Sequence, residues 1–245
     1  MLRNDGRSAI DLRPVSIEID SYGYGEGTAL IKMGCTTVLC AATIEAGVPP
    51  WMKGHGRGWI TSEYSLLPRS TTTRNRRERQ GAGGRTQEIQ RLIGRALRAA
   101  ADLSLLGDYT ITIDCDVLQA DGGTRTAAIT GGYVALALAL QRLVQRGNIA
   151  QSPIIREIAA ISAGYVAGEA LLDLDYSEDS AADLDCNVVL TGSGEIIEVQ
   201  CTAEARPIAR TEFDALVDLA ASGVRSLVET QRSVLVRNGV MLEGL

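Results

Sequence analysis

The chain has 245 residues and a formal net charge of −6, from 24 basic and 30 acidic side chains. An acidic total argues against a nucleic-acid-binding protein, because such proteins usually carry an excess of basic residues. The one histidine excludes a metal site built on two histidines of the same chain. The apolar content of 45% is that of a globular protein and excludes disorder as the main state.

The charge is unevenly distributed along the chain. Residues 69–98 contain nine arginines and two acidic residues, a net charge of +7, so the remaining residues together carry −13. Residues 173–185 contain six acidic residues and no basic one. Of the 24 basic residues, 22 are arginines, whose planar guanidinium group can bind phosphate through two hydrogen bonds. The basic segment is suited to a polyanion, and the acidic segment to a cation.

The N-terminal part of the chain is predicted to form a β-sheet. Alternating apolar and polar side chains, bounded by glycine-containing turns, predict strands over residues 15–20, 28–33, 36–44 and 58–67. Residues 69–84 contain no apolar side chain larger than alanine. We therefore expect a long polar loop there, and loops of this length are usually functional or disordered.

Two helices and one strand follow this loop. From Thr86 onward, apolar residues recur with helical spacing between Ile89 and Ala100, which predicts an amphipathic helix. Residues 109–117 alternate as a strand, and a turn with two glycines leads into a second helix over 126–145. This second helix is apolar on nearly all sides, so we expect it to be central and buried.

The C-terminal part is predicted to contain two hairpins and a last helix. The hairpin strands are expected over residues 158–166, 169–174, 186–190 and 196–201. The last helix is expected to begin at Thr211, which would form a capping box with Asp214. Strands, helices, strands and a helix in this order predict an α+β fold. We expect a single domain over residues 1–245, with two β-then-α halves over about residues 10–145 and 155–240.

Five cysteines, with no C-x-x-C pair, indicate a reduced cytoplasmic protein. Small buried hydrophobic side chains are the expected role of Cys35, Cys40, Cys115 and Cys186. The N-terminal residues MLRNDGRSAI contain no apolar signal segment. The longest apolar stretch, around residues 134–140, is too short to cross a bilayer, so no membrane association is expected.

Two glycine pairs at predicted helix starts are candidate phosphate sites. In DGGTR, residues 121–125, the paired glycines let backbone N–H groups approach an anion, while Thr124 supplies a hydroxyl or a helix cap and Arg125 a charged fork. GGRT, residues 83–86, places Arg85 at the other helix start. An ordinary glycine turn with a solvated arginine is the alternative for the first motif, and a helix cap at the end of a mobile loop for the second.

The acidic segment is a candidate metal site. If the chain turns at residues 180–182 and enters a strand at Leu184, the carboxylates of Asp179 and Asp185 face one point. Carboxylate oxygens suit Mg²⁺ or Mn²⁺, which keep several waters and bind through one or two carboxylates. Without other context, a solvated acidic turn is the favoured interpretation.

The arginine-rich loop fits contacts to the phosphate backbone of RNA or DNA. It has no interleaved aromatic residues for base stacking, so we expect it to bind the backbone or the shape of the nucleic acid rather than to read bases. A solvated surface run is the alternative. His55 lies in a loop rich in glycine and proline, with no evident partner, and we assign it no catalytic role. Together the motifs suit an enzyme that brings an ionised phosphate to a polyanionic strand beside a divalent metal, by positioning and charge stabilisation rather than by histidine chemistry.

Long strings spread over nearly the whole chain resemble the bacterial ribonuclease PH family of phosphate-dependent exoribonucleases. They are RNDGR (3–7), LRP (12–14), GWITSEYSLLPRST (58–71), GRTQEIQRLIGRALRA (84–99), IDCDVLQADGGTRTA (113–127), EDSAADLDCNVV (178–189) and EVQCTAE (198–204). The resemblance implies a ribonuclease PH-like fold of the ribosomal protein S5 domain 2 type. It also implies phosphorolytic trimming of tRNA 3′ ends, with release of nucleoside diphosphates and reversible nucleotide addition, in tRNA and rRNA processing.

The resemblance further implies a role for each motif. The phosphate co-substrate would bind at Arg85, Gly123, Thr124 and Arg125. Asp179 and Asp185 would be both the catalytic carboxylates and the ligands of Mg²⁺ or Mn²⁺. Transfer RNA precursors and other RNA 3′ ends would be contacted by Arg69, Arg74, Arg76 and Arg77. The assembly would be a homohexamer, a trimer of dimers that gathers the basic loops around a central opening.

This sequence departs from the family pattern at two places. Cys201 stands where the family usually has glycine, and residues 205–208 read ARPI where the family has a Gly-x-Pro-Phe pattern. Neither departure touches the expected phosphate or metal residues. Two other functions stay open: a catalytically silent RNA-binding ring subunit of the exosome type, and a hydrolytic metal-dependent nuclease. Retention of Arg85, Arg125, Asp179 and Asp185 argues against the silent subunit.

Overall fold

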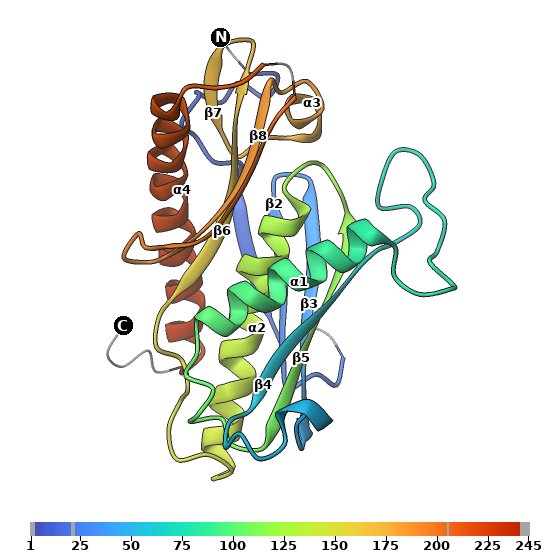
Figure 1. Cartoon of the computed structure of the whole chain (residues 1–245), viewed down its shortest axis with the longest axis vertical. Coiled ribbons are helices and arrows are strands. Elements are labelled where there is room, and N and C mark those ends of the chain that lie inside the picture. Colours follow the sequence, from blue (N-terminus) through green and yellow to red (C-terminus); the bar gives the residue numbers. More distant parts are fainter. Residues whose placement is uncertain (1–2, 21–22, 205, 241–245) are drawn as a thin grey trace.

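The computed structural model describes residues 3–20, 23–204 and 206–240 (Figure 1). These residues form nine strands and four α-helices, with a short 3₁₀ turn at Pro50–Met52. The elements are β1 (Val15–Ile19), β2 (Gly27–Met33), β3 (Thr36–Ala46), β4 (Trp59–Leu66), α1 (Gly84–Ala99), β5 (Tyr109–Gln119), α2 (Thr124–Gln145), β6 (Ile158–Val166), β7 (Glu169–Leu172), α3 (Tyr176–Asp179), β8 (Leu184–Thr191), β9 (Ile196–Ala203) and α4 (Arg210–Arg237).

The first sheet has the strand order β1-β2-β3-β5-β4. Its pairs are antiparallel except β4 with β5, which are parallel because α1 crosses between them. Alternate residues such as Ile111 and Ile113 point into the core and are fully buried against the helices. The strands predicted for this half are confirmed. The segment between β4 and α1 has no helix or strand, as predicted, and extends away from the body of the molecule (Figure 1).

The second sheet has the order β7-β6-β8-β9 and is antiparallel throughout. Helix α4 packs along it (Figure 1). Between the two sheets lies α2, which contacts β2 and β3 on one side and β6 and α4 on the other. One hydrophobic cluster includes residues of both sheets and of α2. The predicted α+β class and the buried second helix are confirmed.

By length and composition alone, α2 is apolar enough to span a bilayer, but 83% of the relevant stretch is buried inside the protein. It is therefore the core helix of the fold. Buried polar contacts fix its position. Thr130 Oγ1 accepts a hydrogen bond from Ala160 N at 3.1 Å, and Gln231 Nε2 donates to Thr130 O at 2.9 Å.

The acidic segment turns at residues 180–181 and enters β8 at Leu184, as predicted, but residues Tyr176–Asp179 before this turn form the short helix α3, which was not predicted. The helix is defined by a capping box. Asp175 Oδ1 accepts from Glu178 N at 2.9 Å, and Glu178 Oε2 accepts from Asp175 N at 3.0 Å. One helical turn contains too few residues to show a helical period, so hydrophobic periodicity could not predict it.

The start of the last helix also differs. The sequence predicted a capping box of Thr211 with Asp214, but α4 begins at Arg210 and its N-cap is Ala209. Glu212 supplies the reciprocal contact, since its carboxylate accepts from Ala209 N at 2.8 Å. The prediction assumed an N-cap with a hydrogen-bonding side chain, Thr211, whereas the N-cap in the structure is Ala209, whose side chain has no such group.

The prediction for the cysteines was wrong at two positions. Cys186 is joined to Cys201 in a disulfide, because β8 and β9 place them directly opposite each other. Cys35 is exposed, since it lies in the tight turn that follows the left-handed Gly34. Cys40 and Cys115 are free and buried, as predicted. Of the four residues 205–208 that depart from the family pattern, Ala205 lies outside the described part of the chain.

Candidate active site

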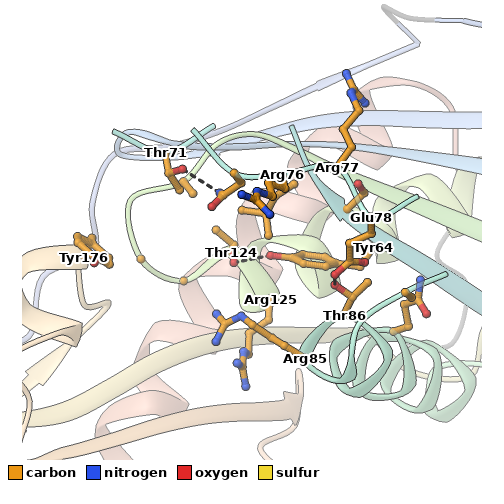
Figure 2. A pocket seen from close by; sticks show the side chains of 18 of the residues that line it. Tyr64, Thr71, Arg76, Arg77, Glu78, Arg85, Thr86, Thr124, Arg125 and Tyr176 are labelled. Atoms are coloured by element: carbon orange, nitrogen blue, oxygen red, sulfur yellow. Dashed lines mark hydrogen bonds between the residues drawn. The ribbon is translucent and has the colours of Figure 1, made fainter. Parts of the chain in front are cut away.

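A pocket of about 900 Å³ lies where the two halves of the chain meet (Figure 2). It is lined by the end of β4, the loop before α1, the first turns of α1 and α2, α3 and β8. Eight of the ten residues that the sequence predicted for the site line it, namely Arg76, Arg77, Arg85, Gly123, Thr124, Arg125, Asp179 and Asp185.

The other two predicted residues are not brought to the pocket. Arg69 is exposed, and its Nη1 donates to Thr72 O at 2.9 Å within its own loop. Arg74 is exposed on the same loop. His55, to which no role was assigned, lies outside the pocket lining, as expected.

The turn before α2 requires both of its glycines. Gly122 and Gly123 have φ values of +73° and +64°, in the left-handed region that favours glycine. A Cβ atom on Gly122 would lie 2.5 Å from Leu174 O, so the turn packs directly against the acidic segment. Gly123 is the N-cap of α2, so Thr124 is not the helix cap that the sequence allowed but the first helical residue. The backbone N–H groups of this first turn are free to meet an anion.

Tyr64 holds the hydroxyl of Thr124. The Tyr64 and Thr124 hydroxyl oxygens are 2.8 Å apart, and the tyrosine is almost fully buried (Figure 2). Burial raises the pKa of Tyr64, so this phenol stays protonated and available as a donor. Tyr64 lies on a strand that the sequence predicted, but its contact with Thr124 was not predicted. The available signal was its position on the inward face, with Ile60 and Ser62.

The two arginines at the helix starts differ in how they are held. Arg125 Nη1 donates to Gln200 Oε1 at 3.0 Å and lies 3.8 Å from Glu88 Oε2. Gln200 in turn donates to Glu88 at 3.0 Å, which fixes the guanidinium group of Arg125. Arg85 is exposed in the first turn of α1 and has no hydrogen bond or ion pair with any described residue. Both guanidinium groups line the pocket (Figure 2), and their positive charges partly offset the rise in the pKa of Asp179 that burial causes.

The carboxyl groups of Asp179 and Asp185 also line the pocket. Burial is the main cause that raises the pKa of Asp179, although Arg125 and Arg85 oppose it. Burial, together with the neighbouring charge of Asp179, raises the pKa of Asp185 to about 6. Two neighbouring carboxyl groups with raised pKa values are typical of a functional site.

This pair fits a divalent cation. Asp185 Oδ1 is buried and has no hydrogen-bond partner among the described residues, which leaves a charged oxygen unsatisfied. No group of three or more His, Cys, Asp or Glu side chains suited to a metal occurs in the described part of the chain. Two carboxylates with water and phosphate oxygens match the preference of Mg²⁺ and do not match that of a fully protein-bound metal.

The N-terminal segment holds the residues around α3 through hydrogen bonds that were not predicted from the sequence. Arg3 Nε donates to Glu178 Oε1 at 2.6 Å, and Arg3 Nη1 donates to Leu172 O at 2.7 Å. Arg13 Nη2 donates to Asp173 Oδ1 at 2.6 Å. The guanidinium groups thus hold the residues on both sides of α3 in place.

Models of one protein family match both halves of the chain. Residues 11–140 match the model of the 3′ exoribonuclease family, domain 1, and residues 157–223 match domain 2 of the same family. A ribonuclease PH of Moorella thermoacetica is 57% identical over 237 residues, which cover 96% of this chain and 95% of the relative.

Solved structures share the fold. Rrp46 of rice has a TM-score of 0.77 at 20% identity, covering 95% of this chain and all of the other. A chain of the Archaeoglobus fulgidus exosome, solved with RNA bound to the active site, has a TM-score of 0.78 at 24% identity, covering 93% and 91%. The predicted ribonuclease PH-like fold is therefore confirmed. By sequence over both of its halves, the chain belongs to the ribonuclease PH family of 3′ exoribonucleases.

Proposed function

We propose that the pocket binds inorganic phosphate and the 3′ end of an RNA, and that Arg85, Gly123, Thr124 and Arg125 hold the phosphate. The protein is a phosphorolytic 3′→5′ exoribonuclease and nucleotidyltransferase, as its family membership and high identity indicate. One observation carries the residue assignment: two guanidinium groups, a helix N-terminus and a pair of carboxyl groups line one pocket.

The chemistry needs positioning and charge stabilisation. Inorganic phosphate is ionised at neutral pH and attacks the last phosphodiester bond, so that the bond to the 3′ oxygen of the preceding nucleotide breaks and a nucleoside diphosphate leaves. Arg85 and Arg125 bind and neutralise the phosphate oxygens, and Thr124, held by Tyr64, orients them. The proton that the leaving 3′ oxygen takes up is supplied by the attacking hydrogen phosphate ion, so the step balances without a protonated carboxyl group.

Asp179 and Asp185 are also the residues that would hold Mg²⁺ or Mn²⁺. When bound, such an ion would supply positive charge beside the phosphate oxygens and the leaving 3′ oxygen. The unsatisfied Asp185 Oδ1 supports this assignment.

The basic loop is proposed to guide the RNA to the pocket. Arg76 and Arg77 line the pocket, and Arg69 and Arg74 lie earlier in the same loop and outside the pocket lining. Their charges suit the phosphate backbone without reading bases. We propose tRNA precursors as the preferred substrates, with other RNA 3′ ends accepted.

We propose a cytoplasmic homohexamer, built as a trimer of dimers, as the working assembly. A structural neighbour described as an archaeal exosome core, with a TM-score of 0.75 at 23% identity, supports the expectation of a ring only through its shared fold. A ring would bring several exposed basic loops to one opening, which suits a structured RNA with a single-stranded tail. Sedimentation in solution tests this assembly.

The experiment that tests the phosphate site is product analysis on a tRNA precursor with and without phosphate. We expect no release when phosphate is omitted and nucleoside diphosphates when it is present. Nucleoside monophosphates in the absence of phosphate would indicate the hydrolytic nuclease instead. Absence of any product, with RNA binding retained, would indicate the silent ring subunit.

A further inference from the structure

Tyr176 is an aromatic side chain that the proposed chemistry does not use. Its side chain is exposed, with 63% of its surface accessible, although the residue lines the pocket (Figure 2). The other aromatic residue among the described lining residues, Tyr64, is 2% exposed and is engaged with Thr124. Tyr176 is therefore the aromatic face of this pocket that is open to a ligand.

The backbone of Tyr176 lies between the turn before α2 and Asp179. Its N–H donates to Asp121 Oδ1 at 3.4 Å, and a Cβ on Gly122 would lie 2.9 Å from the same nitrogen. Asp179 follows it by one helical turn on α3. The backbone of Tyr176 thus lies against the turn before α2 and one helical turn before Asp179, and its side chain lines the same pocket.

The backbone that carries the Tyr176 ring is firmly held. The capping box of Asp175 with Glu178 holds the single turn of α3, and the buried ion pair of Arg3 with Glu178 fixes it to the N-terminal segment. An exposed aromatic ring on a firmly held backbone loses little conformational freedom when a flat ligand packs on it. Exposing the ring to water without a ligand has no evident benefit for folding.

We propose that Tyr176 stacks on one of the two bases that flank the scissile phosphodiester bond, a role that rests on the proposed function of the pocket. The ligand is a nucleobase, either a purine or a pyrimidine, because every base has a π-face on which an aromatic ring can stack. The rest of the lining is rich in arginine, threonine and carboxylate groups, which suit phosphate and sugar. Stacking thus holds the 3′ end in register without selecting its sequence, as an enzyme that removes successive nucleotides requires.

The test uses the full-length protein and short single-stranded RNAs at saturating phosphate. Three substrates are compared: an intact RNA, one with an abasic last nucleotide and one with an abasic penultimate nucleotide. The enzymes are the parent, Tyr176→Ala, Tyr176→Trp and the control Tyr24→Ala, which removes a fully exposed tyrosine outside the pocket. The measured quantities are kcat/KM for RNA at saturating phosphate and, in a second series in which phosphate is varied at saturating RNA, KM for phosphate.

We expect Tyr176→Ala to lower kcat/KM on intact RNA about tenfold or more. On the abasic substrate that lacks the stacked base, Tyr176→Ala and the parent should have the same kcat/KM for RNA. Tyr176→Trp and Tyr24→Ala should behave as the parent, and KM for phosphate should not change. The substrate that becomes insensitive identifies the stacked base.

Equal losses on the intact and both abasic substrates would overturn the proposal, because the ring would then act on something other than a base. Unchanged activity of Tyr176→Ala on intact RNA would overturn it as well. Failure of the proposed function is recognised separately, since the parent itself would then release no diphosphate in the same assay.

Discussion

Arg13 and Asp173 form a buried pair that joins parts of the chain 160 residues apart. Asp173 accepts from the backbone N of Arg13 at 2.8 Å, from Nε at 3.0 Å and from Nη2 at 2.6 Å. The remaining Nη1 of Arg13 donates to Asp121 O, in the phosphate turn. One guanidinium group thus fixes the position of the turn before α2 relative to the acidic segment, and both of these segments contribute residues to the pocket.

Replacement of Arg13 tests this link. Arg13→Met leaves the fully buried carboxylate of Asp173 without its main partner, and we expect the free energy of unfolding to fall by about 3–5 kcal/mol. Urea denaturation measures this loss. The double variant Arg13→Met/Asp173→Asn removes the isolated charge and should recover part of it, because asparagine tolerates the left-handed backbone of residue 173.

A second arginine–aspartate pair serves as the control. Arg142 and Asp20 are 2.9 Å apart but partly exposed, so Arg142→Met should cost about 1 kcal/mol or less. A loss for Arg13→Met no larger than that for Arg142→Met would refute the structural role of the buried pair.

Arg125 is expected to act on phosphate rather than on RNA. Arg125→Ala removes a guanidinium group held by Gln200 toward the pocket, so KM for phosphate should rise about tenfold or more while RNA binding stays near the parent value. Steady-state kinetics and a binding titration measure the two effects. Arg146→Ala, at the exposed opposite end of α2, is the matched control and should change neither. Equal losses of phosphate and RNA affinity would reject the assignment.

Asp185 is expected to make stability depend on pH. Burial and the neighbouring charge of Asp179 raise its pKa to about 6 in the folded protein, from an ordinary value of 3.8, so the folded state binds the proton more tightly. The free energy of unfolding should therefore fall as pH rises from about 4 to 6, and the ionised carboxyl should destabilise the fold above that range. Asp185→Asn should be more stable than the parent at pH 8, by on the order of 1–2 kcal/mol after allowing for solvent screening, and equal to it near pH 4.

This measurement is made with a chelator present, so that no divalent cation offsets the charge. Adding Mg²⁺ should then stabilise the parent and not the Asp185→Asn variant. Asp218→Asn changes an exposed carboxyl on α4 and should show neither effect. An Asp185→Asn protein less stable than the parent at pH 8 would disprove that the ionised carboxyl is destabilising.

The basic loop should contribute through counterion release. Neutralising Arg74, Arg76 and Arg77 together should weaken tRNA binding and make it less dependent on salt concentration, by up to about three units in the logarithmic slope. A filter-binding titration over a range of salt concentrations measures the slope, on samples of matched oligomeric state. The control neutralises the exposed arginines Arg146, Arg210 and Arg237. An unchanged slope for the loop variant would leave it no role in RNA binding.

Much of the fold was predictable because its signals are local. Alternation marks strands such as residues 15–20, and glycine pairs mark the turns before α1 and α2. The helix α3 was missed because a single turn has no period, and the disulfide was missed because strand register brings Cys186 opposite Cys201. Register is a property of the folded sheet and is absent from a linear pattern.

The site was predictable where one segment carries a whole motif, as at residues 121–125. Tyr64, Gln200 and Arg13 were missed because each acts through a residue far along the chain. Charge counts separated the basic loop from the acidic segment but could not tell that Arg76 and Arg77 face the pocket while Arg69 does not. Those distinctions depend on the path of an extended loop.

The most direct test of the account follows the phosphate atom. The protein is incubated with unlabelled RNA, Mg²⁺ and radiolabelled inorganic phosphate, and the released nucleotides are separated. We predict that the label appears in the terminal phosphate of nucleoside diphosphates, and that Arg125→Ala lowers this transfer at limiting phosphate. Release of unlabelled nucleoside monophosphates as the only products would contradict phosphate as the attacking group, and with it the function proposed for the pocket.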